Sequence, residues 1–389
     1  MTTLVSDNII SALGFTTDEN FDKVKLGKSG LTFFGDYFDL PEPFMASMID
    51  EKRLNDAFGK LQNRKPETRN QNPQNYTKLE KIAILSISNA LKTKEINPSH
   101  EKVLFILSTA KGNVFLLDLL RKKGYEPEQV FLWRSAELIA DYFGNPNTPI
   151  TVSNACISGA QALIAARRAL QSGKYKYVIV TGVDMLSRFV ISGFQSFKAL
   201  SLSNCKPFDA NRDGLNIGEA AATIILSDKQ EADVQQGEVI LTAGAIRNDA
   251  NHISGPSRTG EGAYLALQDV CSGINTDELA FINAHGTATP YNDEMEAIAI
   301  TRAGLQHVPV NSLKGYFGHT LGCAGVLESI ISTRSLKDRK ILKTFGFEML
   351  GVSQPLQIVT KKKKTTCNRC INMLSGFGGC NAALLWHLI

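Results

Sequence analysis

The chain has 389 residues, of which 43% are hydrophobic and 21% charged, a composition typical of globular proteins and not of disordered or fibrous ones. Its net charge is only +4, and no basic stripe interleaved with aromatic residues occurs, which argues against a nucleic-acid partner. The N-terminal segment lacks the features of a secretory signal, and no stretch has the apolar length of a membrane span. We therefore expect a cytoplasmic protein without a membrane span.

The first half of the chain alternates predicted helices and strands, after an N-terminal part with few interpretable patterns. Residues 62–75 are polar and are expected to form a loop. Helical spacing of apolar residues and continuous apolar or β-branched runs predict the remaining elements. The helices cover residues 79–91, 113–123, 135–143 and 156–172, and the strands cover residues 103–107, 150–152 and 177–181. This alternation is typical of an α/β fold with right-handed crossovers.

The second half repeats the alternation. Its predicted strands cover residues 238–246, 279–284 and 308–310, and its helices cover residues 260–270, 293–303 and 322–336. The last helix aligns without gaps on the helix that begins at Cys156, with Gly325 on Gly159 and Arg334 on Arg168. Near the end of each half, GEAAATIIL (218–226) aligns with GCNAALLWH (379–387). These matches indicate an internal duplication, with halves at residues 1–230 and 231–389.

Seven cysteines at irregular spacing indicate free thiols rather than a disulfide framework. Cys367 and Cys370 form a single CxxC, but no second pair or nearby histidine accompanies it. Because a structural zinc site needs four ligands, a strand that carries two cysteines explains this pair better. We expect neither a metal nor a cofactor.

Cys156 lies where the predicted strand 150–152 turns sharply into the helix 156–172. At a helix N-terminus, unpaired backbone N–H groups and the positive end of the helix dipole favour thiolate over thiol. This position predicts a nucleophile. The alternative for an isolated cysteine is a small, buried structural residue.

Three later segments favour the nucleophile. Residues 283–296 carry His285, residues 311–325 carry Lys314 and His319, and residues 374–384 are rich in glycine. Each follows a predicted strand, and ligand sites in α/β folds collect at the carboxyl ends of strands, so we expect all of them to converge on Cys156. A thiol with two imidazole donors suits acyl transfer followed by carbanion formation at a thioester.

These segments resemble a known family. NACISGAQAL, NAHGTATPYND, NSLKGYFGHTLGCAGVLES and SGFGGCNAAL, together with KPFDANRDGLNIGEAAA, are similar in order and spacing to signature segments of β-ketoacyl-[acyl-carrier-protein] synthases. These are the elongating Cys-His-His condensing enzymes of the thiolase superfamily. The resemblance implies a thiolase-like, five-layered αβαβα fold built from two related halves, in a homodimer or a heterodimer with a related synthase.

The resemblance also implies an activity and its catalytic residues. A 3-oxoacyl-[acyl-carrier-protein] synthase joins an acyl-cysteine to a malonyl group on acyl carrier protein by decarboxylative Claisen condensation. Cys156 would accept the acyl group, and His285 and His319 would bind the malonyl thioester carbonyl. Lys314 would orient the histidine loops, and Glu328 would pair with Lys314 or brace those loops.

Two phenylalanines complete the implied site. The backbone N–H groups of Cys156 and Phe377 would form the oxyanion hole. Phe377, and also Phe194, would gate the acyl pocket, although Phe194 is equally well explained as a core aromatic. The basic run Lys361–Lys364 has two interpretations. It is either a solvated turn or a surface segment that attracts an acidic carrier protein.

The sequence also departs from the family pattern. MTTLVSDNIISALG (1–14) lacks the Thr-Gly-x-Gly turn that usually ends the first strand, and STAKGNVF (108–115) replaces a more glycine-rich turn. These departures favour a specialised pathway, such as aryl polyene or polyketide-like lipid assembly, over primary fatty-acid elongation.

Two alternatives remain: a thiolase with Cys380 as its catalytic base, and a non-catalytic chain-length subunit of a heterodimeric synthase.

Overall fold

The structure is a computed structural model that describes residues 1–63, 75–119 and 124–389. Its main sheet has eleven strands in the order β13-β11-β10-β15-β16-β9-β1-β8-β6-β4-β5. The strands of the first half are β1 (Thr2–Ser11), β4 (Val103–Ser108), β5 (Ile150–Val152), β6 (Tyr177–Asp184) and β8 (Ala220–Asp228). Those of the second half are β9 (Val239–Asn248), β10 (Leu279–Asn283), β11 (Pro309–Asn311), β13 (Gln357–Ile358), β15 (Arg369–Gly376) and β16 (Cys380–Leu388).

The two halves of the sheet have the same topology. The order β1-β8-β6-β4-β5 in one half corresponds to β9-β16-β15-β10-β11 in the other, with two antiparallel pairs followed by two parallel pairs in each. The halves meet through β1 and β9, which pair at Thr3 and Ile240. The two aligned segments at 218–226 and 379–387 contribute β8 and β16, which occupy equivalent places. This correspondence supports the duplication, and the boundary at residues 230/231 remains our proposal.

Both faces of each half-sheet are buried. On β4, Leu104 and Ile106 face the central core, whereas Val103, Phe105 and Leu107 face an outer core. On β16, Leu384 and Trp386 face the central core and the intervening Leu385 faces another outer core. This alternation follows from the two-residue period of a strand.

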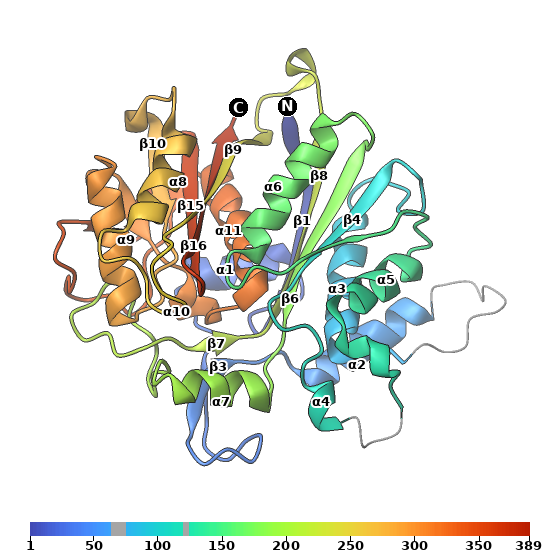
Figure 1. Ribbon diagram of the computed structural model, residues 1–389. Coiled ribbons are helices and arrows are strands. Elements are labelled where there is room, and N and C mark those ends of the chain that lie inside the picture. Colours follow the sequence, from blue (N-terminus) through green and yellow to red (C-terminus); the bar gives the residue numbers. More distant parts are fainter. Residues whose placement is uncertain (64–74, 120–123) are drawn as a thin grey trace.

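Helices cover both faces of each half-sheet (Figure 1). The central layer contains α6 (Ser158–Gln171) and α11 (Ala324–Lys337) between the half-sheets. The outer layers contain α2 (Glu51–Gln62), α3 (Lys78–Leu91) and α5 (Leu132–Tyr142) on one side, and α8 (Glu261–Cys271) and α9 (Pro290–Arg302) on the other. The result is the predicted αβαβα arrangement.

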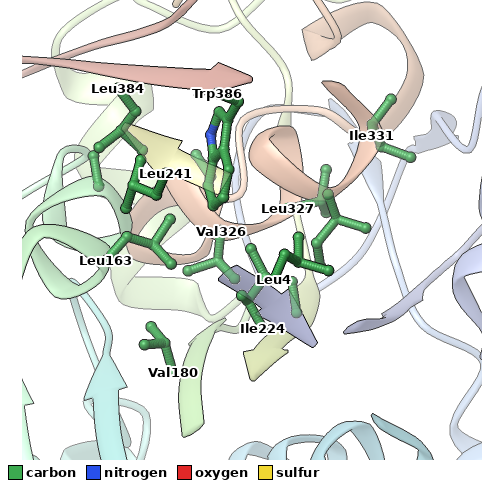
Figure 2. Packing of buried hydrophobic residues seen from close by; sticks show 14 of the residues in the cluster. Leu4, Leu163, Val180, Ile224, Leu241, Val326, Leu327, Ile331, Leu384 and Trp386 are labelled. Carbon is green, nitrogen blue, oxygen red and sulfur yellow. The ribbon is translucent and has the colours of Figure 1, made fainter. Parts of the chain in front are cut away.

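The central core joins the two halves. Figure 2 shows Leu163 of α6, Val326 of α11, Ile224 of β8 and Trp386 of β16 packed together. The Trp386 side chain is fully buried, and its indole N–H donates to Ser329 Oγ at 3.3 Å. Residues from both halves therefore share one apolar interior.

The helices α6 and α11 cross at the two glycines that the duplication aligns. A Cβ on Gly159 would lie 2.8 Å from Val326 N, and a Cβ on Gly325 would lie 2.3 Å from Ala160 N. Such distances are shorter than any ordinary contact, so only glycine permits this approach. The crossing brings the N-terminal ends of both helices together, next to Cys156 and His319.

We predict that Gly159→Ala destabilises the protein by about 1–3 kcal/mol or more, because the helices must separate. Urea unfolding would measure the effect. The matched control is Gly193→Ala on the helix α7 (Arg188–Ser196), where an added Cβ meets no atom within 4 Å. A Gly159→Ala variant as stable as this control would contradict the close crossing.

Several predicted elements differ from the structure. The helix expected at 113–123 is represented by the single turn α4 (Leu116–Leu119), and residues 120–123 lie outside the described residues. In the loop expected at 62–75, Gln62 ends α2, and residues 64–74 lie outside the described residues. The CxxC pair does not lie in one strand, because β15 begins at Arg369 and includes only Cys370.

The N-terminal part, for which we predicted no elements, contains the central strand β1 and the helix α1 (Thr17–Lys25). It also supplies β2 (Thr32–Phe34) and β3 (Phe44–Ser47), which form a small sheet with β7 (Ile217–Gly218). This sheet and α7 lie together at one end of the molecule (Figure 1). Among the described residues, no helix combines the length and the apolar character that crossing a membrane requires.

The remaining short elements are connectors. They are the 3₁₀ helices η1 (Pro127–Val130), η2 (Glu231–Asp233), η3 (Thr276–Glu278) and η4 (Leu321–Cys323), the helix α10 (Lys314–Phe317), and the strands β12 (Lys340–Ile341) and β14 (Lys363–Lys364).

Candidate active site

A cavity of about 390 Å³ lies where the four predicted segments meet. Cys156 follows β5, His285 follows β10, His319 follows β11, and Phe377 follows β15, and all four line this cavity. β10, β11 and β15 are parallel neighbours, so their carboxyl ends share one edge, and Cys156 reaches the same cavity from β5 of the other half-sheet. Each half of the chain contributes part of the wall.

A strained turn holds Cys156. Ala155, the preceding residue, has a φ of 46°, in the left-handed region that non-glycine residues rarely adopt. Ser158 Oγ accepts the Asn154 N–H at 2.8 Å and donates to Ala155 O at 2.6 Å, which fixes this conformation. Gly376 lies alongside, where a Cβ would come within 3.1 Å of Cys156 N.

The predicted thiolate is wrong for the resting protein. Burial raises the pKa of the Cys156 thiol to about 12, although the Lys314 charge and the Phe377 N–H act in the opposite direction. Desolvation disfavours the charged form and here outweighs the helix N-terminus. Cys156 is therefore a thiol that must lose its proton during the reaction.

The two histidines are neutral. Burial and the nearby Lys314 charge hold the pKa of both His285 and His319 well below 6.5. Their rings lie 4.9 Å apart at 86° to each other, and one ligand atom from each and from Cys156 all lie within 4.8 Å of one another. A thiol and two uncharged imidazoles thus share one small volume.

Lys314 fixes the tautomer of His285. Its ammonium group donates to Glu328 Oε1 at 2.5 Å and lies 3.5 Å from His285 Nδ1. Because an ammonium group can only donate, Nδ1 of His285 must accept, which leaves its proton on Nε2. Both Lys314 and Glu328 are buried, so the sequence prediction that they pair matches the geometry.

Acidic residues that we did not predict hold the His285 loop. Glu296 accepts the N–H groups of His285 and Gly286, each at 2.7 Å, and burial raises its pKa to about 8. Asp293 accepts the N–H groups of Phe208 at 2.7 Å and Ala288 at 3.2 Å. The NDEME sequence near the start of the helix after the histidine turn was the available signal, because Asp293 in the first turn of α9 and Glu296 three residues later can reach back to that turn.

A third buried carboxylate joins the halves near His319. Asp184, at the end of β6, accepts the N–H groups of Gly322 at 2.7 Å and Ala110 at 2.8 Å. It also accepts the Thr109 hydroxyl proton at 2.8 Å. The turn in STAKGNVF therefore positions the segment after His319, a role that its sequence did not indicate.

Three phenylalanine rings form one wall of the cavity. Phe377 stacks on Phe194 at 6.0 Å and meets Phe197 edge-on at 5.6 Å. The implied position of Phe194 beside the cavity matches the structure, and it also packs into an apolar cluster with Val190 and Ile191. Sequence reasoning did not identify Phe197.

Two other candidates lie away from this site. Cys380 is not among the residues that line the cavity, and its thiol accepts from Asn248 Nδ2 at 3.4 Å. In the exposed run Lys361–Lys364, Lys363 and Lys364 pair with β12 beyond the C-terminal end of α11, whereas the cavity lies at the opposite end of that helix. A helix of 14 residues spans about 21 Å, so this run is remote from Cys156.

Metal binding is disfavoured by charge. Cys156, His285 and His319 are the only three-residue set of potential metal ligands in the described ranges. The Lys314 ammonium beside His285 opposes a cation there. The same charge favours a developing anion, such as an enolate.

Acid should destabilise the protein through the two histidines. Their folded-state pKa lies below 6.5, so below that pH the unfolded chain binds protons that the folded chain does not, and stability falls. By themselves the two histidines reduce the free energy of unfolding by about 2–3 kcal/mol between pH 7.5 and 5.5, whereas Glu296, whose pKa is raised to about 8, acts in the opposite direction. Urea unfolding at both pH values, compared with a variant that lacks the histidines, would measure their share.

The control is the His285→Asn/His319→Asn double variant, in which carboxylates with raised pKa values titrate as in the wild type. Its stability should fall by less over the same interval. If the free energy of unfolding changed equally with pH in the two proteins, the histidines would not be the cause of the acid sensitivity.

Comparisons with known proteins agree with this geometry. Residues 9–232 match the description "Beta-ketoacyl synthase, N-terminal domain", and residues 239–348 match "Beta-ketoacyl synthase, C-terminal domain". The chain belongs to the β-ketoacyl synthase family. The family predicted from the sequence is therefore confirmed.

The curated proteins that are similar to this chain include 3-oxoacyl-[acyl-carrier-protein] synthases. A putative mitochondrial 3-oxoacyl-[acyl-carrier-protein] synthase of Schizosaccharomyces pombe is 30% identical over 270 residues, 64% of this chain and 63% of that protein. The 3-oxoacyl-[acyl-carrier-protein] synthase 2 of Vibrio cholerae is 30% identical over 256 residues, 61% of each chain. The matched segments thus span less than two thirds of these relatives.

Solved structures confirm the thiolase-like ketosynthase fold. A ketosynthase in complex with its chain length factor from Xenorhabdus doucetiae has a TM-score of 0.87 at 24% identity, covering 100% of this chain and 98% of the other. The ishigamide ketosynthase/chain length factor has a TM-score of 0.86 at 21% identity, covering 100% and 99%. At these identities the likeness establishes the fold alone.

Proposed function

We propose that this chain is a 3-oxoacyl-[acyl-carrier-protein] synthase, an acyltransferase that catalyses decarboxylative Claisen condensation. The observation that carries the proposal is the convergence of the buried Cys156 thiol with two buried, neutral imidazoles at one cavity. Family membership supports the same reaction. The substrates are an acyl thioester and a malonyl thioester, each on the phosphopantetheine arm of acyl carrier protein.

In the first half-reaction, Cys156 Sγ attacks the acyl thioester carbonyl. Because the thiol pKa is about 12, its proton must leave as the new bond forms, and a neutral imidazole within 4.8 Å can accept it. The N–H groups of Cys156 and Phe377 stabilise the tetrahedral oxyanion. The proton then passes to the departing pantetheine thiolate.

In the second half-reaction, the malonyl thioester occupies the same cavity. His285 donates its Nε2 proton to the thioester carbonyl, and His319 lies beside the same position. Carbon dioxide leaves, and the electron pair of the broken bond forms an enolate next to the Lys314 charge. The enolate carbon attacks the acyl-Cys156 carbonyl, and the Cys156 sulfur leaves.

Mass spectrometry of the intact protein tests the proposal directly. Incubation with an acyl-carrier protein should add one acyl mass to wild type at Cys156 and none to Cys156→Ala. Cys380→Ala provides the matched control, since its thiol does not line the cavity, and it should be acylated as wild type is. An unmodified wild-type Cys156 would overturn the proposal.

The alternatives have less support. A thiolase would need a second cysteine in the cavity, and Cys380 is not there. Carbon dioxide release from labelled malonyl-carrier protein distinguishes the two reactions. A non-catalytic chain-length subunit would not need a nucleophile, whereas Cys156 is held in a strained turn beside both histidines.

We further propose acyl carrier protein and a second synthase-like subunit as partners, in a homodimer or heterodimer. Two of the similar structures are described as ketosynthases with chain length factors, and a third as a type II polyketide ketosynthase with its carrier protein. These similarities support a specialised lipid or polyketide-like pathway over primary fatty-acid synthesis. The seven free cysteines are consistent with a cytoplasmic location.

A further inference from the structure

The ring of Phe377 contacts α7 at two points. Phe194, inside the last turn of that helix, stacks on it at 6.0 Å and 25°. Phe197, directly after the helix, meets it at 5.6 Å and 65°. Phe194 is 8% exposed, whereas Phe197 is 59% and Phe377 43% exposed, so Phe197 forms the outer side of this three-ring cluster.

The backbone holds Phe197 in place. Ala199 N donates to Phe194 O at 3.1 Å, and Lys198 N donates to Gln195 O at 2.8 Å. These bonds close the helix end around Lys198, whose φ of 51° is in the left-handed region. The backbone position from which the Phe197 side chain extends is therefore fixed relative to Phe194.

Phe377, in contrast, has a permissive backbone. Gly376 precedes it, and Gly378 and Gly379 follow it with φ values of 89° and 73°. Hydrogen bonds fix the backbone after Phe377: Gly378 N donates to Ile253 O at 2.7 Å, Gly378 O accepts from Asn248 Nδ2 at 2.9 Å, and Gly379 O accepts from Asp249 N at 2.8 Å. None of these bonds reaches the Phe377 ring, whose aromatic contacts are with Phe194 and Phe197.

The Phe377 ring lies close to the thiol that is proposed to react. The Phe377 N–H is hydrogen-bonded to the Cys156 thiol, and the Phe377 ring lines the cavity together with Phe194 and Phe197. Val190 and Ile191, which pack with Phe194, do not line the cavity and so lie behind this wall. An acyl chain attached to Cys156 gains the most by burial against apolar surface. A long chain that extends past the three-ring wall must move at least one of its rings, whereas an acetyl group need not.

We propose that Phe197 is a positioning residue that holds the Phe377 ring across the cavity and so sets the enzyme's selectivity between short and long acyl chains. The inference rests on the proposed synthase function. An aromatic pair of this kind changes the population of the closed arrangement by about 2- to 10-fold. Phe197→Ala should therefore raise the ratio of the dodecanoyl to the acetyl acylation rate of Cys156 by about that factor.

Two variants control for a general disturbance of α7. Phe189→Ala removes a ring of similar exposure, 52%, from the same helix, at a position that does not line the cavity. It should leave the ratio of long-chain to acetyl rates as in wild type. Phe197→Tyr keeps the ring and should also preserve the wild-type ratio.

A second measurement does not depend on the proposed reaction. The rates at which iodoacetamide and a bulky aryl maleimide alkylate Cys156 report how easily a small and a large reagent reach the thiol. Phe197→Ala should raise the maleimide rate relative to the iodoacetamide rate, and Phe189→Ala should not.

The outcomes separate the two proposals. Failure of every acyl thioester to modify wild-type Cys156 would refute the synthase function, and the alkylation ratio would still decide the role of Phe197. Equal effects of Phe197→Ala on small and large reagents, or the same shift in Phe189→Ala, would overturn the role of Phe197.

Discussion

Replacing Cys156 with alanine should reduce condensation by at least ~10³-fold while malonyl decarboxylation continues. The acyl group loses its only covalent acceptor, but the imidazoles and Lys314 that stabilise the enolate do not depend on the thiol. Removal of a small side chain from a turn fixed by Ser158 should not move them. Assays of labelled carbon dioxide release and of 3-oxoacyl product would measure the two steps separately.

His285→Ala provides the complementary result. It removes the donor whose tautomer Lys314 sets, so decarboxylation should fall by about 10²–10³-fold. Acylation of Cys156 should decrease less, because His319 also lies within proton-transfer range. If the alanine variants at Cys156 and His285 lost the same step to the same extent, the division of roles between them would be wrong.

The second large effect concerns the buried pair Lys314–Glu328. Lys314→Met should destabilise the protein by about 3–5 kcal/mol, because it leaves Glu328 without its cation in an apolar interior. Adding Glu328→Gln should recover much of that loss, since no buried charge then remains unpaired. Decarboxylation should stay low in both proteins, because neither has a cation beside His285.

Urea unfolding and carbon dioxide release, measured on the single and double variants, separate stability from chemistry. Lys340→Met is the matched control, since its partner Asp338 and Lys340 itself are each 36% exposed. An exposed pair of this kind contributes at most about 1 kcal/mol. Full activity in the stable double variant would show that Lys314 acts only as a structural residue.

The sequence was most informative at turns between strands and helices. Cys156, His285 and His319 could be recognised because each follows a predicted strand in a segment of distinctive composition. Parallel pairing brings the segments that follow β10, β11 and β15 to one edge, and the packing of the two halves adds the segment that carries Cys156. The aligned glycines 159 and 325 were likewise found as a repeat before the structure placed them at one helix crossing.

The central strand β1 was missed because its sequence is not a clean apolar or alternating run. Asp7 and Asn8 interrupt the pattern, yet Asn8 is buried and donates to Phe15 O at 3.3 Å, while Asp7 accepts the Thr17 hydroxyl proton at 2.6 Å. Polar side chains can occupy a buried strand when distant residues supply their partners. Such partners are invisible to periodicity.

By itself the sequence determined the α/β class and the family, and it singled out Cys156, His285 and His319 as the proposed nucleophile and imidazoles, because these depend on residue types at fixed positions along the chain. The tertiary structure decided how those residues behave. Burial makes Cys156 a thiol despite its place at a helix start, and Lys314 fixes the His285 tautomer from another segment. Desolvation and charge act through space, so only the folded chain sets them.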